Sequence, residues 1–439
     1  MLGIERRFSL VEKIVWVECT NNKKKKYLSA FFVRNIDIYF NILIFMKKVL
    51  IVNKFYYPRG GDCVCAINLE KLLRQKGHEV AVFAMKYDEN IQSEYSKYFA
   101  SNVDFAGGIG SKLNAAQRIF GKGSIKKEFA RMLNEFNPDV VHLHNIHSYL
   151  SPIVAKMAKQ YGAKVVWTLH DYKLLCPSYA CLNNGTPCEL CYNDKKWVLK
   201  NRCMKGSLVA SVLAYLEAKY WNRTKLEKYV DAFVCPSAFM QSRMKLGNFG
   251  KLNVVCNFVD PVKLELFKSQ DVNDRQDYYV YVGRLSEEKG IATLVNVAKE
   301  IDFNLKIVGG GPLENQLRQI CENNSQIEFL GHQDAESVAK LLSAARFSIV
   351  PSEWYENNPL SVIESLCAGT PVIGTDIGGI PELFDGKNGM IVKMGSAIHL
   401  RKAILDSIDK KWQYDKIKEK AIVRFSHETY YSELCKVYG

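Results

Sequence analysis

Short apolar runs alternate with longer amphipathic segments along most of the chain. Residues 62–76 show the helical type of segment, which ends at Gly77, a residue that tolerates the left-handed conformation beyond a helix. The apolar runs are continuous, as is typical of strands in parallel sheets that are buried on both faces. The candidate strands are 48–53, 79–84, 139–143, 164–169, 232–235, 278–282, 304–308, 327–330, 347–350 and 371–374.

The alternation breaks twice. Residues 171–206 are loop-like and rich in cysteine, and residues 257–277 lack periodicity, which indicates a linker. The pattern therefore predicts an α/β protein with two Rossmann-like, doubly wound domains that face each other across a cleft, 46–258 and 259–424. Ligands of such sheets bind beyond the carboxyl ends of the strands, so we expect the chemistry in those loops.

Residues 1–45 differ from the rest of the chain. They contain a run of four lysines from Lys23 and an interrupted apolar stretch, and Met46 then opens the first predicted strand. We expect Met46 to be the natural start; the alternative is a membrane-surface anchor made of the basic run and the aromatic residues. The chain has no stretch of about 18 apolar residues, and a secretory signal is not expected.

The net charge of +14 is unevenly distributed. Residues 46–260 carry 31 Lys or Arg and 17 Asp or Glu, whereas residues 261–439 carry 21 and 25. A basic first half favours nucleic acid, an anionic membrane or a phosphorylated substrate as partner, and surface lysines that serve solubility are the alternative.

Two loops have the composition of phosphate-binding loops. Gly60 and Gly61 follow the first strand and precede a helix, where a backbone can approach an anion closely; a plain tight turn is the alternative. The loop 283–290 holds Arg284 and Lys289, which can neutralise a diphosphate or form a solvated charged turn. A third loop, 309–312, places Gly310 among three glycines before another helix.

The segment 351–389 carries the strongest signal. Glu356 precedes a helix that starts near Pro359, and Glu364 lies inside this helix with seven residues between the two carboxylates. Glu364 lies in an apolar run, where a charge is costly without a partner such as the hydroxyls of a ribose. The free amides that could hold a phosphate or sugar are those of Asn357, Asn358 and Leu360.

These motifs, in this order, resemble the retaining family-4 glycosyltransferases of the GT-B fold, also called glycosyl transferases group 1. The resemblance covers residues 46–439 and includes Glu356-x7-Glu364, 369–372, 378–382 and the closing 425–428. It implies a nucleotide diphosphate sugar as donor, transfer with retention, and no cofactor or metal for catalysis. It also implies that the last helix, within 425–439, returns to the first domain.

The resemblance assigns roles to the motif residues. Glu364 is expected to bind the ribose, Glu356 the donor sugar, and Arg284 with Lys289 the leaving diphosphate, which Gly60 and Gly61 cap from the first domain. Asn357, Asn358, Leu360 and Gly310 complete the predicted donor site. His144, at the end of the strand 139–143, is expected to meet the donor sugar, while His170 or Asp171 faces the acceptor.

Five cysteines lie within residues 176–203 of a chain that contains thirteen. Cys188-x2-Cys191 is half of a zinc knuckle, and Cys176 with Cys203 would complete four ligands for a structural zinc. Unligated thiols and a redox site are the alternatives. The remaining cysteines are scattered, as in a reduced cytosolic protein.

Together these features predict a glycosyltransferase that acts on a glycan or lipid-linked acceptor in bacterial-type surface polysaccharide synthesis. We expect it in the cytoplasm, associated with the anionic inner face of the plasma membrane, without nucleic acid as a partner. The alternatives are a sugar-nucleotide epimerase with the same fold and a zinc-containing nucleic-acid-binding protein.

Overall fold

A computed structural model of the 439-residue chain describes residues 46–104 and 108–439. Residues 48–439 form one compact unit. The prediction that residues 1–45 precede the natural start lies outside the described residues.

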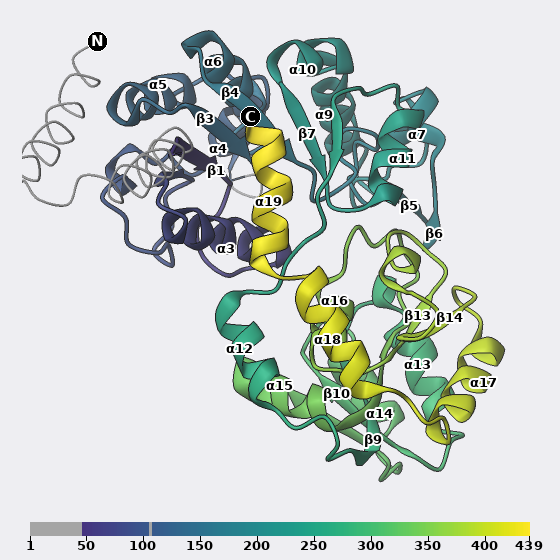
Figure 1. The fold of residues 1–439 in the computed structure, drawn as a ribbon. Coiled ribbons are helices and arrows are strands. Elements are labelled where there is room, and N and C mark those ends of the chain that lie inside the picture. Colours follow the sequence, from purple (N-terminus) through teal and green to yellow (C-terminus); the bar gives the residue numbers. More distant parts are fainter. Residues whose placement is uncertain (1–45, 105–107) are drawn as a thin grey trace, which may run out of the picture. The chain divides into compact units, whose positions relative to one another are not determined.

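The first sheet has six parallel strands in the order β2-β1-β3-β4-β7-β8 (Figure 1). Alternate residues point to opposite faces: Leu50 and Val52 belong to one buried cluster, and Val49 and Ile51 to the other. The strands are β1 (Lys48–Val52), β2 (Glu79–Phe83), β3 (Val140–Leu143), β4 (Lys164–Thr168), β7 (Ala232–Cys235) and β8 (Leu252–Val254).

Helices cover both faces of this sheet. One face packs against α4, α5, α6, α10 and α11, and the other against α3 and α19. These helices are α3 (Gly61–Gln75), α4 (Ile109–Ile119), α5 (Ile125–Phe136), α6 (Ile153–Tyr161), α10 (Arg223–Tyr229), α11 (Ala238–Leu246) and α19 (His427–Tyr438). Burial on both faces explains why the strands are continuous apolar runs.

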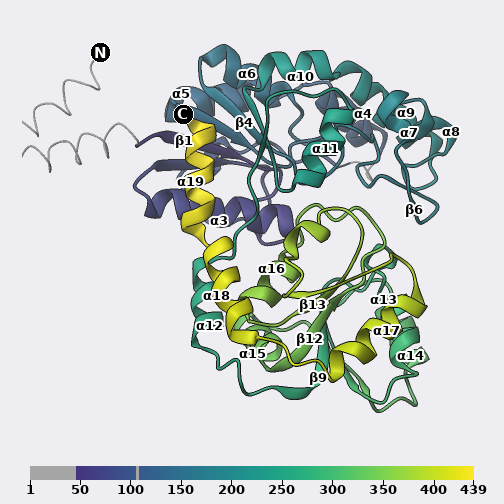
Figure 2. The same ribbon diagram turned by 45° about the vertical axis from the view of Figure 1, so that its right-hand side comes forward.

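The second sheet also has six parallel strands, in the order β11-β10-β9-β12-β13-β14. Strands β9, β12 and β13 are labelled in Figure 2. One face packs against α12, α15, α16 and α18, and the other against α13, α14 and α17. The strands are β9 (Gln276–Val282), β10 (Asn304–Val308), β11 (Ile327–Gly331), β12 (Ala345–Val350), β13 (Val372–Thr375) and β14 (Gly389–Val392). The helices are α12 (Pro261–Ser269), α13 (Ile291–Ala298), α14 (Glu314–Ile320), α15 (Ala335–Ala344), α16 (Leu360–Cys367), α17 (Ala397–Ile408) and α18 (Tyr414–Arg424).

The predicted α/β class with two parallel sheets is confirmed, and each of the ten candidate strands is a strand. The sequence analysis missed β8 and β14, the last strand of each sheet. Both are short and only partly buried, so they lack the continuous apolar run that marked the others.

The predicted linker 257–277 contains a helix, α12, which its lack of periodicity did not predict. The Asp260 carboxylate accepts hydrogen bonds from the backbone amides of Val262 and Lys263, and Pro261 occupies the first helical position. Both are standard start signals of a helix. The short segment that follows them lacks a clear apolar stripe, which is why periodicity alone did not reveal it.

The cysteine-rich segment 171–206 has no long element, as predicted. It contains a small hairpin of β5 (Leu182–Asn183) and β6 (Thr186–Pro187), followed by α7 (Leu190–Asn193) and α8 (Trp197–Lys200). The longer α9 (Leu208–Tyr220) comes next. The 3-10 helices are η1 (Ser96–Tyr98), η2 (Glu287–Lys289) and η3 (Pro381–Leu383).

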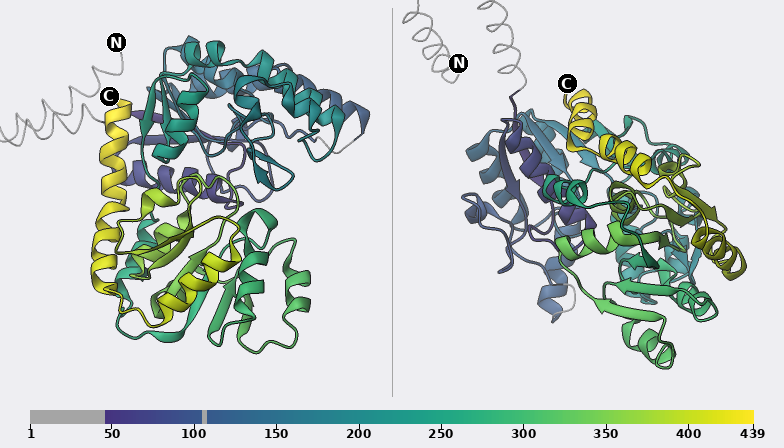
Figure 3. Two further views of the ribbon diagram at one scale, coloured as in Figure 1. Left: turned by 90° about the vertical axis from the view of Figure 1, so that its right-hand side faces the viewer. Right: turned by 60° about the horizontal axis from the view of Figure 1, so that its bottom comes forward.

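The last helix, α19, returns to the first sheet, as the family resemblance implied (Figure 3). The Tyr438 hydroxyl lies 2.7 Å from His142 Nδ1 on β3, and the Tyr438 carbonyl accepts a hydrogen bond from Lys164 Nζ of β4 at 3.0 Å. Leu434 and Val437 are buried in the same cluster as β1. The carboxyl-terminal helix is therefore part of the first domain's core.

Within the described residues, no helix combines the length and the apolar character needed to cross a bilayer.

Candidate functional site

In each sheet, predicted site residues lie in the loops that follow the two strands where the strand order reverses. In the first sheet the order reverses between β1 and β3, and in the second between β9 and β12. The loops that follow these four strands carry Gly60, His144, Lys289 and Glu356. Such topological switch points are where doubly wound sheets bind ligands.

Glu356 and Lys289 form an ion pair between the loops that follow β12 and β9. Lys289 Nζ lies 2.6 Å from Glu356 Oε1, and the Ser352 hydroxyl donates to the same oxygen at 2.7 Å. Glu356 is only 6% exposed. Burial by itself would raise the pKa of Glu356, but the Lys289 charge and the hydrogen bonds outweigh it and hold the pKa below its ordinary value. The carboxylate is therefore ionised at neutral pH.

Glycines allow the backbone to pack tightly around this pair. Gly290 has a φ of 66°, and a Cβ there would lie 2.0 Å from the Pro351 carbonyl oxygen. Gly378, with a φ of 63°, lies against the backbone of Glu356, and the amide of Gly379 donates to the Glu356 carbonyl at 2.7 Å. The glycine loop after β13 thus supports the loop that carries Glu356.

The glycines after β10 serve packing between loops as well. A Cβ on Gly309 would lie 2.0 Å from the Gly283 carbonyl oxygen, and one on Gly311 would lie 2.4 Å from that of Leu285. Gly310 accepts a hydrogen bond from the Leu285 amide at 3.0 Å. These glycines hold the loop 283–285 in place, a role that the sequence analysis had not assigned to them.

Glu364 has a protein partner. Its Oε1 lies 2.7 Å from Nζ of Lys263 on α12, and its side chain is 12% exposed. A charge in this apolar run needs a partner, and the structure supplies Lys263. Lys263 lies in the helix that the sequence analysis missed. The predicted contact with a ribose stays a prediction.

The asparagines after Glu356 join the two domains. Asn357 Nδ2 donates to the Leu169 carbonyl at 2.7 Å, and its Oδ1 accepts from the Ser237 hydroxyl at 3.0 Å. Asn358 Oδ1 accepts from the Asn257 amide at 3.0 Å. Both side chains are thus used for contacts to the first half of the chain, a role that the sequence did not suggest; the predicted role of their backbone amides, and that of Leu360, stays a prediction.

Two further contacts connect the domains. The Glu382 carboxylate accepts hydrogen bonds from the amides of Ala238, at 2.7 Å, and Phe239, at the start of α11. The Tyr355 hydroxyl donates at 3.0 Å to Glu189 of the cysteine-rich segment, whose carboxylate also pairs with Arg243 at 2.6 Å. The residue next to Glu356 therefore contacts the cysteine-rich segment.

Three histidines stack at the carboxyl ends of β3 and β4. The ring centroids of His142 and His144 are 4.6 Å apart, and those of His144 and His170 are 5.1 Å apart. Both nitrogens of His142 have partners, Tyr438 and Thr168, each at 2.7 Å, as predicted for a core histidine. Burial lowers the pKa of His142 to about 3 and of His170 to about 4, so both rings are neutral at pH 7.

The start of α3 is open. A Cβ on Gly61 would meet no atom within 4 Å, and Gly60 has an extended backbone. Asp62 follows in the first turn, and its Oδ2 accepts a hydrogen bond from Asn145 Nδ2 at 2.9 Å. The sequence analysis did not single out Asp62; its position directly after the paired glycines was the available signal.

Two other predicted site residues, Arg284 and Asp171, form none of the contacts described above. Arg284 has an exposed side chain. Asp171 accepts a hydrogen bond from the Lys173 amide at 2.9 Å in a local turn. Burial raises the pKa of Asp171, and that turn hydrogen bond is the largest effect opposing it.

The cysteine-rich segment brings three thiols together, but not the predicted four. Cys176, Cys181 and Cys191 are buried, and hydrogen bonds from the other two thiols lower the pKa of Cys176. Cys188 and Cys203 are partly exposed. In the ranges 46–104 and 108–439, no group of three or more His, Cys, Asp or Glu side chains is arranged to hold a metal ion. The predicted zinc set of Cys176, Cys188, Cys191 and Cys203 stays a prediction.

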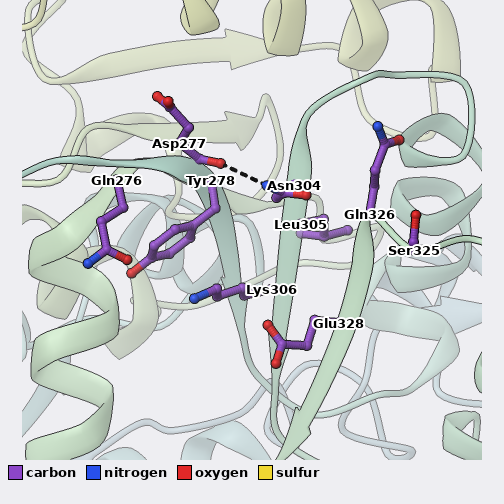
Figure 4. A pocket seen from close by; sticks show the side chains of 9 residues that line it. All are labelled: Gln276, Asp277, Tyr278, Asn304, Leu305, Lys306, Ser325, Gln326 and Glu328. Carbon is purple, nitrogen blue, oxygen red and sulfur yellow. Dashed lines mark hydrogen bonds between the residues drawn. The ribbon is translucent and has the colours of Figure 1, made fainter.

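A hollow of about 420 Å³ lies at the other end of the second sheet (Figure 4). Gln276 and Asn304, at the amino ends of β9 and β10, line it together with Ser325 and Glu328. Because ligands of doubly wound sheets bind at the carboxyl ends, this hollow is not the predicted site.

Two family models match this chain. Residues 59–263 match the family model described as glycosyltransferase family 4, and residues 262–424 match the model described as glycosyl transferases group 1. A glycosyltransferase of Methanocaldococcus jannaschii, itself uncharacterized, is 25% identical over 373 residues, which are 83% of this chain and 89% of that protein.

Solved structures share the fold. The HepE protein of Anabaena in complex with UDP-glucose superposes with a TM-score of 0.58 at 16% identity, over 89% of this chain and 99% of that chain. The lipopolysaccharide outer core galactosyltransferase WaaB superposes with a TM-score of 0.59 at 18% identity, over 88% and 98%. These similarities show that the two-sheet architecture is the GT-B fold.

Proposed function

The chain belongs to glycosyltransferase family 4, with a carboxyl-terminal domain of the glycosyl transferases group 1, and on that basis we propose that it transfers a sugar with retention from a nucleotide diphosphate sugar. The ion pair of Lys289 and Glu356 at the switch point of the second sheet carries the proposal. It places a fixed cation and a fixed carboxylate where a doubly wound sheet binds its ligand. The HepE structure of the same fold holds UDP-glucose, which supports the class of the donor.

In the proposed reaction, the bond between the anomeric carbon and the diphosphate oxygen breaks while an acceptor hydroxyl attacks from the same face. The hydroxyl proton passes to the leaving phosphate oxygen, so the products are a glycoside and a nucleoside diphosphate. Lys289 and the exposed Arg284 stabilise the negative charge that develops on the leaving group. These two cations perform a task that other enzymes give to a metal ion, so we propose that catalysis needs no metal.

The remaining residues bind and orient the donor. Glu356 contacts the sugar near the transferred carbon, and Glu364 binds the ribose after exchanging part of its contact with Lys263. Gly60 and Gly61 cap the diphosphate at the start of α3, where a Cβ on Gly61 would meet no atom within 4 Å and free amides favour an anion. His144 meets the donor sugar, and His170 with Asp171 lies on the acceptor side.

For the acceptor we propose a glycan or a lipid-linked glycan of a surface polysaccharide, reached in the cytoplasm at the inner face of the plasma membrane. The WaaB structure, a lipopolysaccharide outer core galactosyltransferase of the same fold, supports this class. The basic first domain would hold the enzyme near anionic lipids. Both matching family models describe glycosyltransferases, and they support neither alternative, an epimerase or a nucleic-acid-binding protein.

A thermal-shift screen of nucleotide diphosphate sugars tests the donor. A ligand at 100 times its Kd stabilises the folded state by about 2.7 kcal/mol, so the true donor should raise Tm by several degrees. Lys289→Met should lose this shift, while the matched change Lys299→Met, at an exposed lysine of the same domain, should keep it.

The donor found in this way is then used with a glycan acceptor, and NMR of the product reports the anomeric configuration. Retention and undiminished turnover in EDTA are the expected results. An inverted product, or activity that disappears with EDTA and returns with a divalent cation, would contradict the proposed mechanism. A Tm that no nucleotide sugar changes would contradict the donor class.

A further inference from the structure

His144 has a buried nitrogen without a partner. Its Nε2 forms no hydrogen bond within the described part of the chain, although His144 is only 2% exposed. Its backbone is fixed, because the His144 carbonyl accepts a hydrogen bond from the Trp167 indole at 2.8 Å. A buried polar atom that protein groups do not satisfy points to a ligand that does.

Whether this nitrogen is a donor or an acceptor depends on His170. His144 Nδ1 lies 2.8 Å from His170 Nε2, and a hydrogen bond between two neutral rings contains one proton. If that proton belongs to His144, its Nε2 is a bare acceptor. If it belongs to His170, His144 Nε2 carries a proton and can only donate.

The charges around His170 decide between the two arrangements. Asp62 is the carboxylate that acts on His170, and the amide of Asn145 holds Asp62 at 2.9 Å. His144 occupies Nε2 of His170, so Nδ1 is the nitrogen available for a proton, and the negative charge of Asp62 favours a proton on it over a lone pair. Lys54 also acts on His170, and it opposes a second proton on the ring.

The other neighbours do not compete for these protons. His142 stacks on His144 but uses both of its nitrogens for Tyr438 and Thr168. Asp171, next in sequence to His170, accepts from the Lys173 amide.

We propose that Asp62 and His170 are positioning residues that keep the proton of His144 on Nδ1, so that His144 Nε2 accepts a hydrogen bond from a hydroxyl group of the bound sugar. In this arrangement the charge of Asp62 favours a proton on His170 Nδ1. His170 Nε2 then accepts a hydrogen bond from His144 Nδ1–H, and His144 Nε2 has a lone pair. The identity of the ligand as a sugar rests on the proposed function, whereas the tautomer of His144 does not.

The tautomer can be measured without any ligand. In the full-length protein labelled with 15N-histidine, the shifts of the ring nitrogens distinguish protonated from bare nitrogen, and the loss of one pair of signals in His144→Gln assigns His144. We expect a protonated Nδ1 and a bare Nε2 at pH 7. A protonated Nε2 in the wild-type protein would overturn the proposal, even if the protein proves to be a glycosyltransferase.

Variants then test the two positioning residues. Asp62→Asn keeps the size of the side chain and removes its charge, so a mixture of His144 tautomers and a loss of about tenfold in kcat/KM are expected. Asp62→Glu, which keeps the charge, should retain the wild-type tautomer. Asp88→Asn, at an exposed aspartate of the same domain, is the control for unchanged spectra and activity.

His170 is tested by one substitution. His170→Leu removes the ring nitrogen that accepts from His144 Nδ1, so the His144 tautomers should become mixed in this variant. Equal tautomer populations in Asp62→Asn and the wild type, or in His170→Leu and the wild type, would contradict the positioning role. If no nucleotide sugar binds while the tautomers behave as expected, the proposed function fails and the tautomer control stands.

Discussion

At the scale of single residues, the site depends on a carboxylate that stays charged despite burial. Lys289 and Ser352 both contact Oε1 of Glu356, and together they keep the pKa of this carboxyl below its ordinary value. A depressed carboxyl pKa stabilises the folded state above the pKa of the unfolded chain, and this stabilisation is lost as the pH falls through the folded-state pKa. Lys289 thus determines the pH at which Glu356 becomes neutral.

The pairing of Lys289 with Glu356 predicts how Lys289→Met changes the pH dependence of kcat/KM. In the wild type, kcat/KM should stay high down to a pH below the ordinary range of a carboxyl group. In Lys289→Met only the remaining hydrogen bonds oppose the effect of burial on the Glu356 pKa, so the acid limb should move to higher pH. The value of kcat should fall by about tenfold or more, which is about 1.4 kcal/mol of transition-state binding. Steady-state kinetics across the acid range measures both effects.

The control for this profile is Lys299→Met, which should leave the acid limb in place. Glu356→Gln should remove the limb altogether because the titrating group is gone. An acid limb at the same pH in Lys289→Met and the wild type would contradict the pairing.

At the scale of elements, the loops after β12 and β13 reach across to α11 and to the loop after β4. Glu382 holds the first two amides of α11, where the helix has free donors and a positive dipole end. Ser237 satisfies the Met240 amide of the same helix and also contacts Asn357. The start of α11 is thus capped partly by its own domain and partly by the other.

Glu382→Ala should therefore destabilise a helix of the other domain. We expect a loss of about 0.5–2 kcal/mol in the free energy of unfolding, the usual cost of removing a helix cap. Hydrogen exchange at the amides of Ala238 and Phe239 should become faster. Glu328→Ala, at an exposed glutamate on β11, serves as the control.

One outcome would contradict the predicted role of Glu382. Unchanged exchange at both amides in Glu382→Ala, together with an unchanged Tm, would show that the contact between Glu382 and α11 does not form in solution.

At the scale of the whole molecule, the positive charge belongs to the first half of the chain. Exposed lysines on α5, Lys126 and Lys127, are part of this excess. Lys195 of the cysteine-rich segment also contributes to the excess, but it is partly buried and donates to the carbonyls of Leu174 and Leu175, so it is not free to meet a membrane surface. A membrane-facing surface, if it is basic, should therefore include α5.

Flotation with liposomes tests this surface. The protein should float with vesicles that contain anionic lipid and not with neutral ones, and the double variant Lys126→Glu, Lys127→Glu should bind less, because each basic residue near such a surface contributes about 1 kcal/mol. Lys411→Glu with Lys416→Glu changes the charge equally in the other domain and should have no effect. Equal binding to neutral and anionic vesicles would contradict an electrostatic attachment.

The sequence predicted those parts of the fold that depend on local pattern. Largely apolar runs identified ten strands, because burial on both faces leaves few polar positions in them. It missed β8 and β14, which are recognisable as strands only by pairing with a sheet, and α12, whose signal was the cap at Asp260 and Pro261 rather than periodicity.

For the site, the sequence determined which residue types are present and that they follow strands: the paired glycines, the cations of 283–290 and the two glutamates. Only the tertiary structure decided which of them meet. It paired Glu356 with Lys289, gave Glu364 to Lys263, and stacked His144 on His170 near Asp62. The physical reason is that contacts between loops depend on the order of strands in the sheets, and strand order is fixed by packing over the whole domain rather than by any local run of residues.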